Sequence, residues 1–439
     1  MKTGILQTLH LRLSRDKAVS DLAMGAGLAL FLRCLGAGAA FALNVVIGRT
    51  LGLSEAGLYF TALSLASILA VVARLGIDNA LLRLVAAEVA QDDWASARGY
   101  FVKGVTIVSA VGVLLVLGVV LLAPLIAEDI LGQKEMLGPI RFIAPSIAFF
   151  ALMLVTAECL RGVGRIRDSV LVSGAIYPVF ALLMIWPLAR LLGADGAALA
   201  YSAGTGFAAA YGFWSWRRLT SAKAPAGPVD TARMTGIARK LWLATVINSA
   251  LVPWLPVLVL GAVYGPAETA QLGAATRLAV IISFIFIAAN TVLAPKFAQL
   301  EAKGQRDEMI RIARRFSLLT MFVSSPALVV MIFYPGVVMS LFGPGFSEGG
   351  TALTIVVLGQ TINATFGLVL NLLLITGHER DIRNAALFSG AVLVAVTLVL
   401  LPPIGLLGAA TANAAAVAAA NLYGLWMVRK RLGFWIYPR

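Results

Sequence analysis

Charged residues are scarce in this chain. Asp, Glu, Lys and Arg together account for 13% of its 439 residues, about half of the share that soluble globular proteins carry. Hydrophobic residues make up 60%, and the mean hydropathy is +0.91. This balance leaves too little polar surface for a soluble fold, so we expect lipid to surround most of the chain.

Cysteine and histidine are also rare, with two of each. Cys34 and Cys159 lie far apart without a CxxC motif, so they form neither a disulfide framework nor a metal framework. His10 and His378 fall in connections outside the apolar segments. The sequence contains no HExxH, GxSxG, Walker or DxD motif, which are the short signatures of several enzyme classes. We therefore expect a protein that is not an enzyme and that uses no metal or cofactor.

Long apolar segments are abundant. A helix needs about 20 apolar residues to cross the hydrocarbon core of a bilayer, and twelve segments meet this requirement. They lie at about 23–46, 57–75, 104–126, 140–160, 170–192, 196–215, 241–263, 270–293, 317–341, 351–375, 384–404 and 408–427. Sustained alternation of the kind found in membrane barrels is absent. The sequence therefore predicts an all-α membrane protein with twelve transmembrane helices.

The net charge of +14 is unevenly distributed. Of the 35 Lys and Arg residues, 29 fall in the N-terminal arm and in every second connection, counting the helix ends beside them. The opposite connections hold four, which are Arg49, Lys134, Arg141 and Arg190. By the positive-inside rule, both termini are cytoplasmic. Basic loops beside anionic lipid headgroups explain the charge, so we expect a membrane surface and no nucleic acid as its partner.

The two halves of the chain resemble each other when one is shifted by 212 or 213 residues. The matches include Gly48, Gly52, Glu55, Gly164, Arg167, Asp168, Gly193 and Gly196 with Gly261, Gly265, Glu268, Gly377, Arg380, Asp381, Gly405 and Gly408. An internal repeat with an even number of helices predicts two six-helix bundles related by a pseudo-two-fold axis along the membrane normal. We assign residues 1–220 to the first bundle, 221–240 to a flexible cytoplasmic linker and 241–439 to the second bundle.

Two arginines fall inside predicted spans. Arg33 lies near the middle of the first span and Arg277 about two turns into the eighth. An arginine at membrane depth costs about 2.5 to 3.5 kcal/mol on insertion scales, so it is usually compensated by an anion, a polar partner or a water-filled cavity. Both are candidate ligands for an anionic substrate, because guanidinium donates paired hydrogen bonds to phosphate. Snorkelling or a bond to a helix carbonyl is the alternative; we favour the cavity for Arg33 and leave both open for Arg277.

Asparagines also recur within the predicted spans. They are Asn44, Asn248, Asn290, Asn363, Asn371, Asn413 and Asn421. Most of them are expected to form hydrogen bonds between helices, while Asn44, Asn248 and Asn363 are our candidates for binding sugar hydroxyls. Two other stretches, from Arg83 to Lys103 and from Lys296 to Arg315, are predicted as repeated basic amphipathic helices at the membrane surface.

Two longer motifs resemble a known family. The stretch IGRTLGLSEAGLYFTALSLASILAVVARLGIDNALLRLVA, from Ile47 to Ala86, and the stretch AATRLAVIISFIFIAANTVLAPKFAQ, from Ala274 to Gln299, are similar to bacterial polysaccharide flippases of the O-antigen type. These belong to the multidrug, oligosaccharidyl-lipid and polysaccharide exporter superfamily, and the resemblance spans nearly the whole chain. Peptidoglycan-precursor flippases of that superfamily have cavity arginines in helices one, two and eight. Arg277 fits the last of these positions, whereas Ser64 stands at the second-helix counterpart, and the twelve predicted helices depart from the fourteen usual in that group.

The resemblance implies a function. It implies a flippase of the bacterial inner membrane that carries an undecaprenyl-pyrophosphate-linked oligosaccharide to the outer leaflet by alternating access, for surface polysaccharide assembly. The implied partners are the lipid-linked oligosaccharide, the membrane, and a polysaccharide polymerase with other assembly proteins. A multidrug exporter of the same superfamily is the transport alternative. A membrane-bound glycan polymerase or ligase ranks third, because the outer connections are short.

Overall fold

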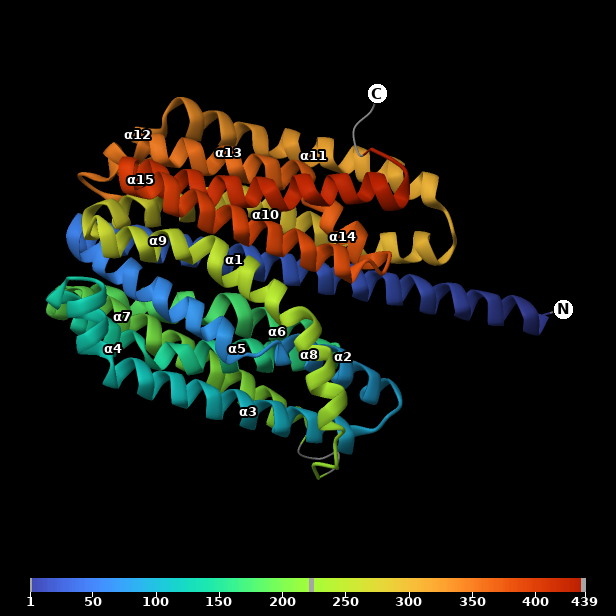
Figure 1. The fold of residues 1–439 in the computed structure, drawn as a ribbon. Helices are drawn as coiled ribbons and strands as arrows, with labels where there is room; N and C mark the ends of the chain where they lie inside the picture. Colours follow the sequence, from blue (N-terminus) through green and yellow to red (C-terminus); the bar gives the residue numbers. More distant parts are fainter. Residues whose placement is uncertain (1, 221–224, 436–439) are drawn as a thin grey trace.

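The protein is helical throughout the part of the chain that the structure describes. The computed structural model describes the backbone of residues 2–220 and 225–435, with side-chain surroundings from Gly27 onward except at 241, 283–292, 294, 295, 298, 302 and 306. Every regular element within those residues is a helix. Helix α1 begins and α15 ends toward the same end of the molecule (Figure 1). We call this end the terminal end and the opposite one the distal end.

Three helices are long enough to cross a bilayer twice. They are α1 (Lys2–Ala73), α7 (Ile176–Thr220) and α15 (Glu379–Leu432). Each contains a glycine with non-helical dihedral angles, with φ of 73° at Gly52, 58° at Gly193 and 48° at Gly405. Positive φ is readily available only to glycine. All three breaks fall in connections that the sequence predicts between consecutive spans.

The remaining elements complete the two halves of the chain. The first half contains α2 (Ile77–Ala90), α3 (Trp94–Leu121), α4 (Leu137–Ile143), α5 (Pro145–Gly162) and α6 (Ile166–Val170). The second half contains α8 (Thr231–Val246), α9 (Val252–Val263), α10 (Pro266–Ala302), α11 (Arg306–Phe333), α12 (Pro335–Met339), α13 (Gly350–Phe366) and α14 (Leu368–Ile375). Among the described residues, eight helical stretches are long and apolar enough to cross a membrane. This is therefore a multi-pass membrane protein, while the total of twelve spans stays a prediction.

Glycines of the two halves adopt matching conformations. The φ angle is 73° at Gly52 and 95° at Gly265, and it is 78° at both Gly164 and Gly377. The pairs are separated by the same shift that relates their sequence motifs, so the sequence similarity extends to the backbone at these positions.

Glu55 and Glu268, which occupy matching positions in the two halves, each lie beside the glycine break of a long helix. The carboxylate of Glu268 lies next to Gly405, where its Oε2 accepts a hydrogen bond from the Leu406 N–H at 3.0 Å. The carboxylate of Glu55 lies next to Gly193 in the same way. An acidic side chain at the start of a helix compensates amide groups that lack a partner within the helix.

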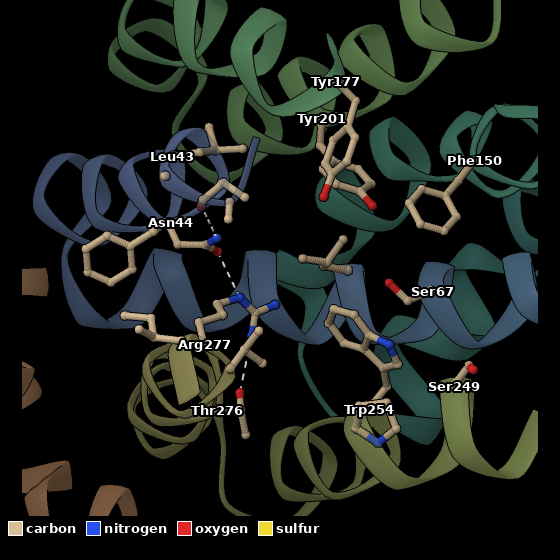
Figure 2. Close-up of a pocket in the computed structure, with 18 of the residues that line it drawn as sticks. Leu43, Asn44, Ser67, Phe150, Tyr177, Tyr201, Ser249, Trp254, Thr276 and Arg277 are labelled. Carbon is tan, nitrogen blue, oxygen red and sulfur yellow. Dashed lines mark hydrogen bonds between the residues drawn. The ribbon is translucent and has the colours of Figure 1, made fainter. Parts of the chain in front are cut away.

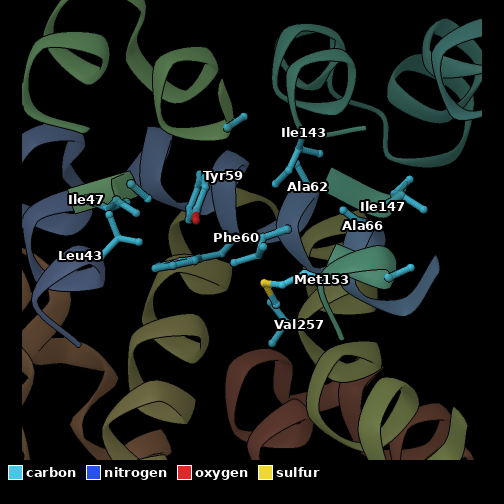
Figure 3. Close-up of a cluster of buried hydrophobic side chains, with 14 of the residues drawn as sticks. Leu43, Ile47, Tyr59, Phe60, Ala62, Ala66, Ile143, Ile147, Met153 and Val257 are labelled. Carbon is cyan, nitrogen blue, oxygen red and sulfur yellow. The ribbon is translucent and has the colours of Figure 1, made fainter. Parts of the chain in front are cut away.

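The two halves are in close contact at the distal end. A side chain at Gly57 of α1 would collide with the carbonyl oxygen of Pro266 at the start of α10. The Nε of Arg49 donates a hydrogen bond to the Leu341 carbonyl at 2.8 Å. Deeper in the molecule, Val257 of α9 joins the same buried cluster as Phe60 of α1 (Figure 3). The absence of a side chain at Gly57 lets the two backbones approach, as is common between membrane helices.

The predicted surface helices were wrong. Neither basic stretch forms one continuous helix, because α2 ends at Ala90 before α3 begins at Trp94, and α10 ends at Ala302 before α11 begins. The turn between α2 and α3 contains Asp92, whose φ angle is 59°. It is followed by Asp93, whose side chain accepts a hydrogen bond from the Ser96 N–H at 2.9 Å. Such N-cap residues start helices.

Part of the predicted linker is helical. Residues 221–224 lie outside the described part, but α8 begins at Thr231, with the Asp230 side chain accepting a hydrogen bond from the Arg233 N–H at 2.9 Å. Met234 and Ala238 of this helix are buried, and the Ala238 carbonyl lies against Gly76 beside α2. The helix therefore packs against the first half of the chain.

Candidate functional site

A cavity of about 850 Å³ lies between the two halves of the chain. Its walls come from α1, α5 and α7 of the first half and from the α9 and α10 regions of the second half (Figure 2). The polar and aromatic residues that line it are Arg33, Phe41, Asn44, Tyr59, Ser67, Arg74, Phe150, Tyr177, Tyr201, Ser249, Trp254, Thr276 and Arg277. The other lining residues are mostly small or aliphatic.

Arg277 reaches into this cavity from α10. Its Nε donates a hydrogen bond to the side-chain oxygen of Asn44 at 2.8 Å, and its Nη1 donates one to the Gly273 carbonyl at 2.9 Å. The guanidinium carbon lies 4.3 Å from the centre of the Phe60 ring and 5.2 Å from that of Trp254. Cation–π contacts of this kind stabilise a desolvated cation. The Nη2 atom is buried without a hydrogen-bond partner, so one donor of the fork is unsatisfied in this conformation.

Asn44 is held by its own helix. Its side-chain nitrogen donates a hydrogen bond to the Ala40 carbonyl at 2.6 Å, which turns the side-chain oxygen toward Arg277. The amide thus orients the guanidinium without neutralising it, since an amide carries no net charge. The sequence allowed two interpretations of Arg277, a hydrogen bond to a helix carbonyl or a place in the cavity. The structure shows both, because Arg277 donates a hydrogen bond to the Gly273 carbonyl and also lines the cavity.

Arg33 lines the cavity from the first limb of α1. It is partly exposed, and it forms no hydrogen bond or ion pair with the described residues. Glu158 and Arg161 of α5, which form an ion pair with each other, are its charged neighbours. Glu158 is paired with Arg161 and does not line the cavity, so the guanidinium of Arg33 faces the cavity without an ion-pair partner of its own.

Arg74 is a third arginine in the cavity wall and was not among the predicted site residues. Its Nη1 lies 2.6 Å from Oδ2 of Asp78, one turn further on, and both side chains are buried. The Arg74 Nε is buried without a partner. The sequence did contain a signal for this pair. Arg74 and Asp78 are four residues apart, a spacing that favours pairing of opposite charges along a helix.

The described lining includes no Asp or Glu and three arginines, of which Arg74 is paired with Asp78 while Arg33 and Arg277 have no carboxylate partner. In a mostly apolar cavity, excess charge of one sign produces a field that is screened much less than at an open surface. The cavity therefore favours an anion over a cation. Grouped His, Cys, Asp and Glu residues that would hold a metal ion are also absent from the described part of the chain.

Aromatic residues form the wall opposite Arg277. The rings of Tyr177 and Tyr201 are 6.0 Å apart and nearly perpendicular, and Phe150 packs against Tyr177 at 6.2 Å. Figure 2 shows both phenol oxygens pointing toward the open space across from Arg277. Aromatic faces with hydroxyl groups at their edges offer apolar contact and hydrogen bonds to the same ligand. No sequence signal separated these tyrosines from other aromatic residues of the spans.

Two of the predicted asparagines lie outside the cavity lining. Asn248 is exposed beside Ser249, which does line the cavity. Asn363 of α13 accepts a hydrogen bond from Asn421 of α15 at 3.3 Å, the contact between helices expected for most asparagines of the spans. Of the predicted site residues, the structure thus brings Arg33, Asn44 and Arg277 to one cavity. Asn290 lies outside the described side chains.

The family model described as "Polysaccharide biosynthesis protein" matches residues 22–301 of the chain. This is more than half of its length. The chain belongs to the polysaccharide biosynthesis protein family. The match includes Arg33, Asn44, Arg74 and Arg277, the four residues that form or orient the charged part of the cavity. No curated protein matches this family member in sequence.

Solved structures share the fold of this polysaccharide biosynthesis family member. An inward-facing multidrug resistance MATE family transporter of the MOP superfamily, which is the exporter superfamily named above, aligns with a TM-score of 0.75 and 14% identity, covering 93% of this chain and 98% of that one. The lipid II flippase MurJ in an inward closed conformation aligns with a TM-score of 0.72 and 15% identity, covering 93% and 87%. The predicted superfamily is confirmed. At these identities the likeness establishes the fold and not the substrate.

Proposed function

We propose that the protein is a flippase for an undecaprenyl-pyrophosphate-linked oligosaccharide in surface polysaccharide assembly. The observation that carries this proposal is the cavity between the two halves, whose described lining holds no carboxylate and two arginines, Arg33 and Arg277, without a carboxylate partner. A pyrophosphate is a compact dianion that pairs well with guanidinium groups. Arg277 offers a buried donor without a partner, and Arg33 offers a guanidinium that no described residue pairs.

The walls of the cavity support a ligand with a sugar beside its phosphate. Tyr177 and Tyr201 supply aromatic faces and hydroxyl groups opposite Arg277. The lipid tail remains in the bilayer in this proposal, so the cavity receives only the polar headgroup. Transport of this kind makes and breaks no covalent bond, and we propose that the protein has no enzymatic activity.

We further propose twelve spans in two six-helix bundles, with residues 1–220 and 241–439 as the bundles and both termini in the cytoplasm of a bacterial cell. The glycine breaks in α1, α7 and α15 support this count, because each divides a long helix where the sequence predicts a connection. The predicted location of 29 of the 35 basic residues on one side of the membrane supports the orientation. In this orientation the terminal end faces the cytoplasm.

Alternating access is the proposed mechanism. The tight contacts at Gly57 and Gly48 close the distal end, since a Cβ at Gly48 would lie 2.7 Å from the Phe342 carbonyl oxygen. At the terminal end, the halves are linked by an exposed ion pair between Arg83 and Glu379, whose closest atoms are 3.5 Å apart. Helix α8 also packs against the first half at this end, beside Gly76. Exposed ion pairs contribute little to stability, so we propose that the terminal end opens at a smaller cost than the distal end.

The test is a flipping assay in proteoliposomes with a lipid-linked pyrophosphate oligosaccharide. Loss of a charge-assisted hydrogen bond costs about 1.5 to 3 kcal/mol, so R277Q and R33Q should each lower the rate at least about tenfold. R190Q removes an exposed arginine that stacks on Trp186 outside the cavity, and it should leave the rate unchanged. Equal rates for R277Q, R33Q and R190Q would remove the proposal.

A multidrug exporter is the second candidate, favoured by the fold likeness to the MATE transporter. The positive lining of the cavity argues against a cationic drug. Deletion of the gene distinguishes the two: loss of surface glycan with unchanged drug resistance supports the flippase, and the reverse result supports the exporter. A glycan polymerase or ligase remains the third candidate. If the protein were such an enzyme, deletion of its gene would cause incomplete glycans to accumulate on the outer leaflet.

A further inference from the structure

A second cleft, separate from the cavity, lies between α11 and the C-terminal segment. It has a volume of about 550 Å³ and is lined by Asp307, Ile310, Arg311, Arg314, Arg315, Leu318 and Phe434. All of these except Phe434 come from the first turns of α11, and three arginines face one carboxylate. The proposed flippase mechanism gives this cleft no role.

The cleft is fixed by contacts between the two segments. Both Nε and Nη2 of Arg314 donate hydrogen bonds to the Trp435 carbonyl, at 3.2 and 2.9 Å. Phe434 is buried in a cluster that contains Met309 and Val428. Arg311 and Arg315 are exposed and form no ion pair or hydrogen bond with the described residues. Arg314 therefore positions the wall, and the other two arginines are free to bind an anion.

The position of the cleft along α11 corresponds to the depth of lipid headgroups. Leu318, Leu319 and Phe322 follow the arginines on the same helix, and all three are exposed. Exposed apolar side chains on a membrane helix face lipid chains, whereas arginines and tryptophans mark the interface. Trp435 is exposed at the cleft with Arg429 stacked 5.7 Å from its ring centre. Basic pockets at this depth are suited to anionic headgroups.

The fold itself does not require arginines at this place. Helices α3 and α11 each contain 28 residues and begin the corresponding spans of the two halves. Aligned on their first residues, which is a shift of 212, Gly99, Val102 and Lys103 of α3 correspond to Arg311, Arg314 and Arg315, whereas the shift of 213 places Arg98 opposite Arg311; in neither register are all three positions basic in α3. A side chain at Gly99 would collide with the Gly227 carbonyl, so the segment after residue 224 covers this surface of α3. The same surface of α11 carries the basic cleft instead.

We propose that this cleft binds the phosphate of an anionic phospholipid from the leaflet at the terminal end, of the phosphatidylglycerol or diphosphatidylglycerol class. Arg311 and Arg315 contact the phosphate, and Leu318 together with the exposed apolar surface beyond it accommodates the first part of an acyl chain. This apolar continuation favours a lipid over free phosphate. The site is independent of the central cavity and of the substrate carried there.

The test uses the full-length protein purified in a neutral detergent. Native mass spectrometry with added phosphatidylglycerol should show a bound lipid that phosphatidylcholine at the same concentration does not replace. A juxtamembrane basic residue contributes about fivefold to the affinity for an anionic lipid surface, so R311Q/R315Q should weaken binding about 25-fold. K103Q/R167Q is the matched control, because it removes two exposed basic residues elsewhere and should bind like the unmodified protein.

Two further measurements decide the outcome if R311Q/R315Q fails to fold. R311K/R315K keeps both charges and should retain binding within about fivefold, while R315Q alone should lose about fivefold. Inorganic phosphate should not compete with phosphatidylglycerol at equal concentration, and competition would overturn the assignment to a lipid. Equal binding of phosphatidylglycerol by the R311Q/R315Q and K103Q/R167Q variants would overturn the site.

Discussion

Arg277 donates a hydrogen bond from Nε to the side-chain oxygen of Asn44 at 2.8 Å, across a separation of 233 residues. The bond joins α10 of the second half to α1 of the first, inside the cavity. Because Asn44 is neutral, the pair keeps the full charge of the guanidinium while fixing its direction. This arrangement suits a site that must bind an anion in one state and release it in another.

Replacement of Asn44 by aspartate should abolish transport. An aspartate at this position would form an ion pair with Arg277 and remove the positive charge offered to the substrate. N44A, which only removes the orienting oxygen, should lower the rate of flipping by several-fold. N248A is the control, since Asn248 does not line the cavity. Initial flipping rates measure all three variants, and an N44D variant as active as N248A would contradict this role for Asn44.

The tyrosine wall should contribute through its rings more than through its hydroxyl groups. Y177F and Y201F keep the aromatic faces and should lower the rate of flipping only a few-fold, whereas the alanine variants should lower it about tenfold or more. F207A is the matched control, because Phe207 stacks on Phe180 at 4.7 Å and does not line the cavity. Equal effects of the phenylalanine and alanine variants would assign the role to the hydroxyls instead.

The buried pair of Arg74 and Asp78 should be important for stability. Removing one partner of a buried ion pair leaves an uncompensated charge and costs about 3 to 5 kcal/mol, so D78N should lower the melting temperature strongly. R165Q breaks the exposed pair of Arg165 and Asp168 and should change the free energy of unfolding by less than about 1 kcal/mol. Thermal unfolding followed by tryptophan fluorescence compares the two variants. Similar melting temperatures would show that the Asp78 pair is not desolvated.

A side chain at Gly57 should weaken closure of the distal end. In G57A the new methyl group collides with the Pro266 carbonyl, so the two halves separate there more often. Cys34 lines the cavity, whereas Cys159 is fully buried, and a membrane-impermeant thiol reagent therefore reports access to Cys34.

We expect G57A to increase labelling of Cys34 from the distal side of the membrane, relative to the unmodified protein. G118A is the matched control, because a Cβ at Gly118 would have no atom within 4 Å. Increased labelling in G118A as well, or none in G57A, would show that Gly57 does not form the closure.

Much of the fold could be predicted from the sequence, because transmembrane helices follow from apolar length and connections from glycine and charge. Gly52, Gly193 and Gly405 all break helices at predicted connections. The helix starts at Asp93 and Asp230 were not predicted, because both N-cap residues lie in basic, weakly apolar stretches without the long apolar run that marks a transmembrane helix.

The candidate site was only partly predictable. Arg33 and Arg277 were found because charge at membrane depth is costly and therefore informative. Tyr177 and Tyr201 carry no such cost, and only the packing of α7 against α1 and α5 brings them to the cavity. The direction in which Asn248 and Asn363 point likewise depends on neighbouring helices, which a single sequence does not specify.

Binding of the lipid-linked pyrophosphate oligosaccharide to the purified protein tests the central claim most directly. Titration followed by native mass spectrometry should show binding that is lost in R33Q/R277Q and retained in R190Q. An analogue with the same glycan and lipid but no phosphate should bind at least about tenfold more weakly to the unmodified protein. Equal affinity for the two ligands, or undiminished binding by R33Q/R277Q, would contradict recognition of the phosphorylated headgroup by the cavity arginines.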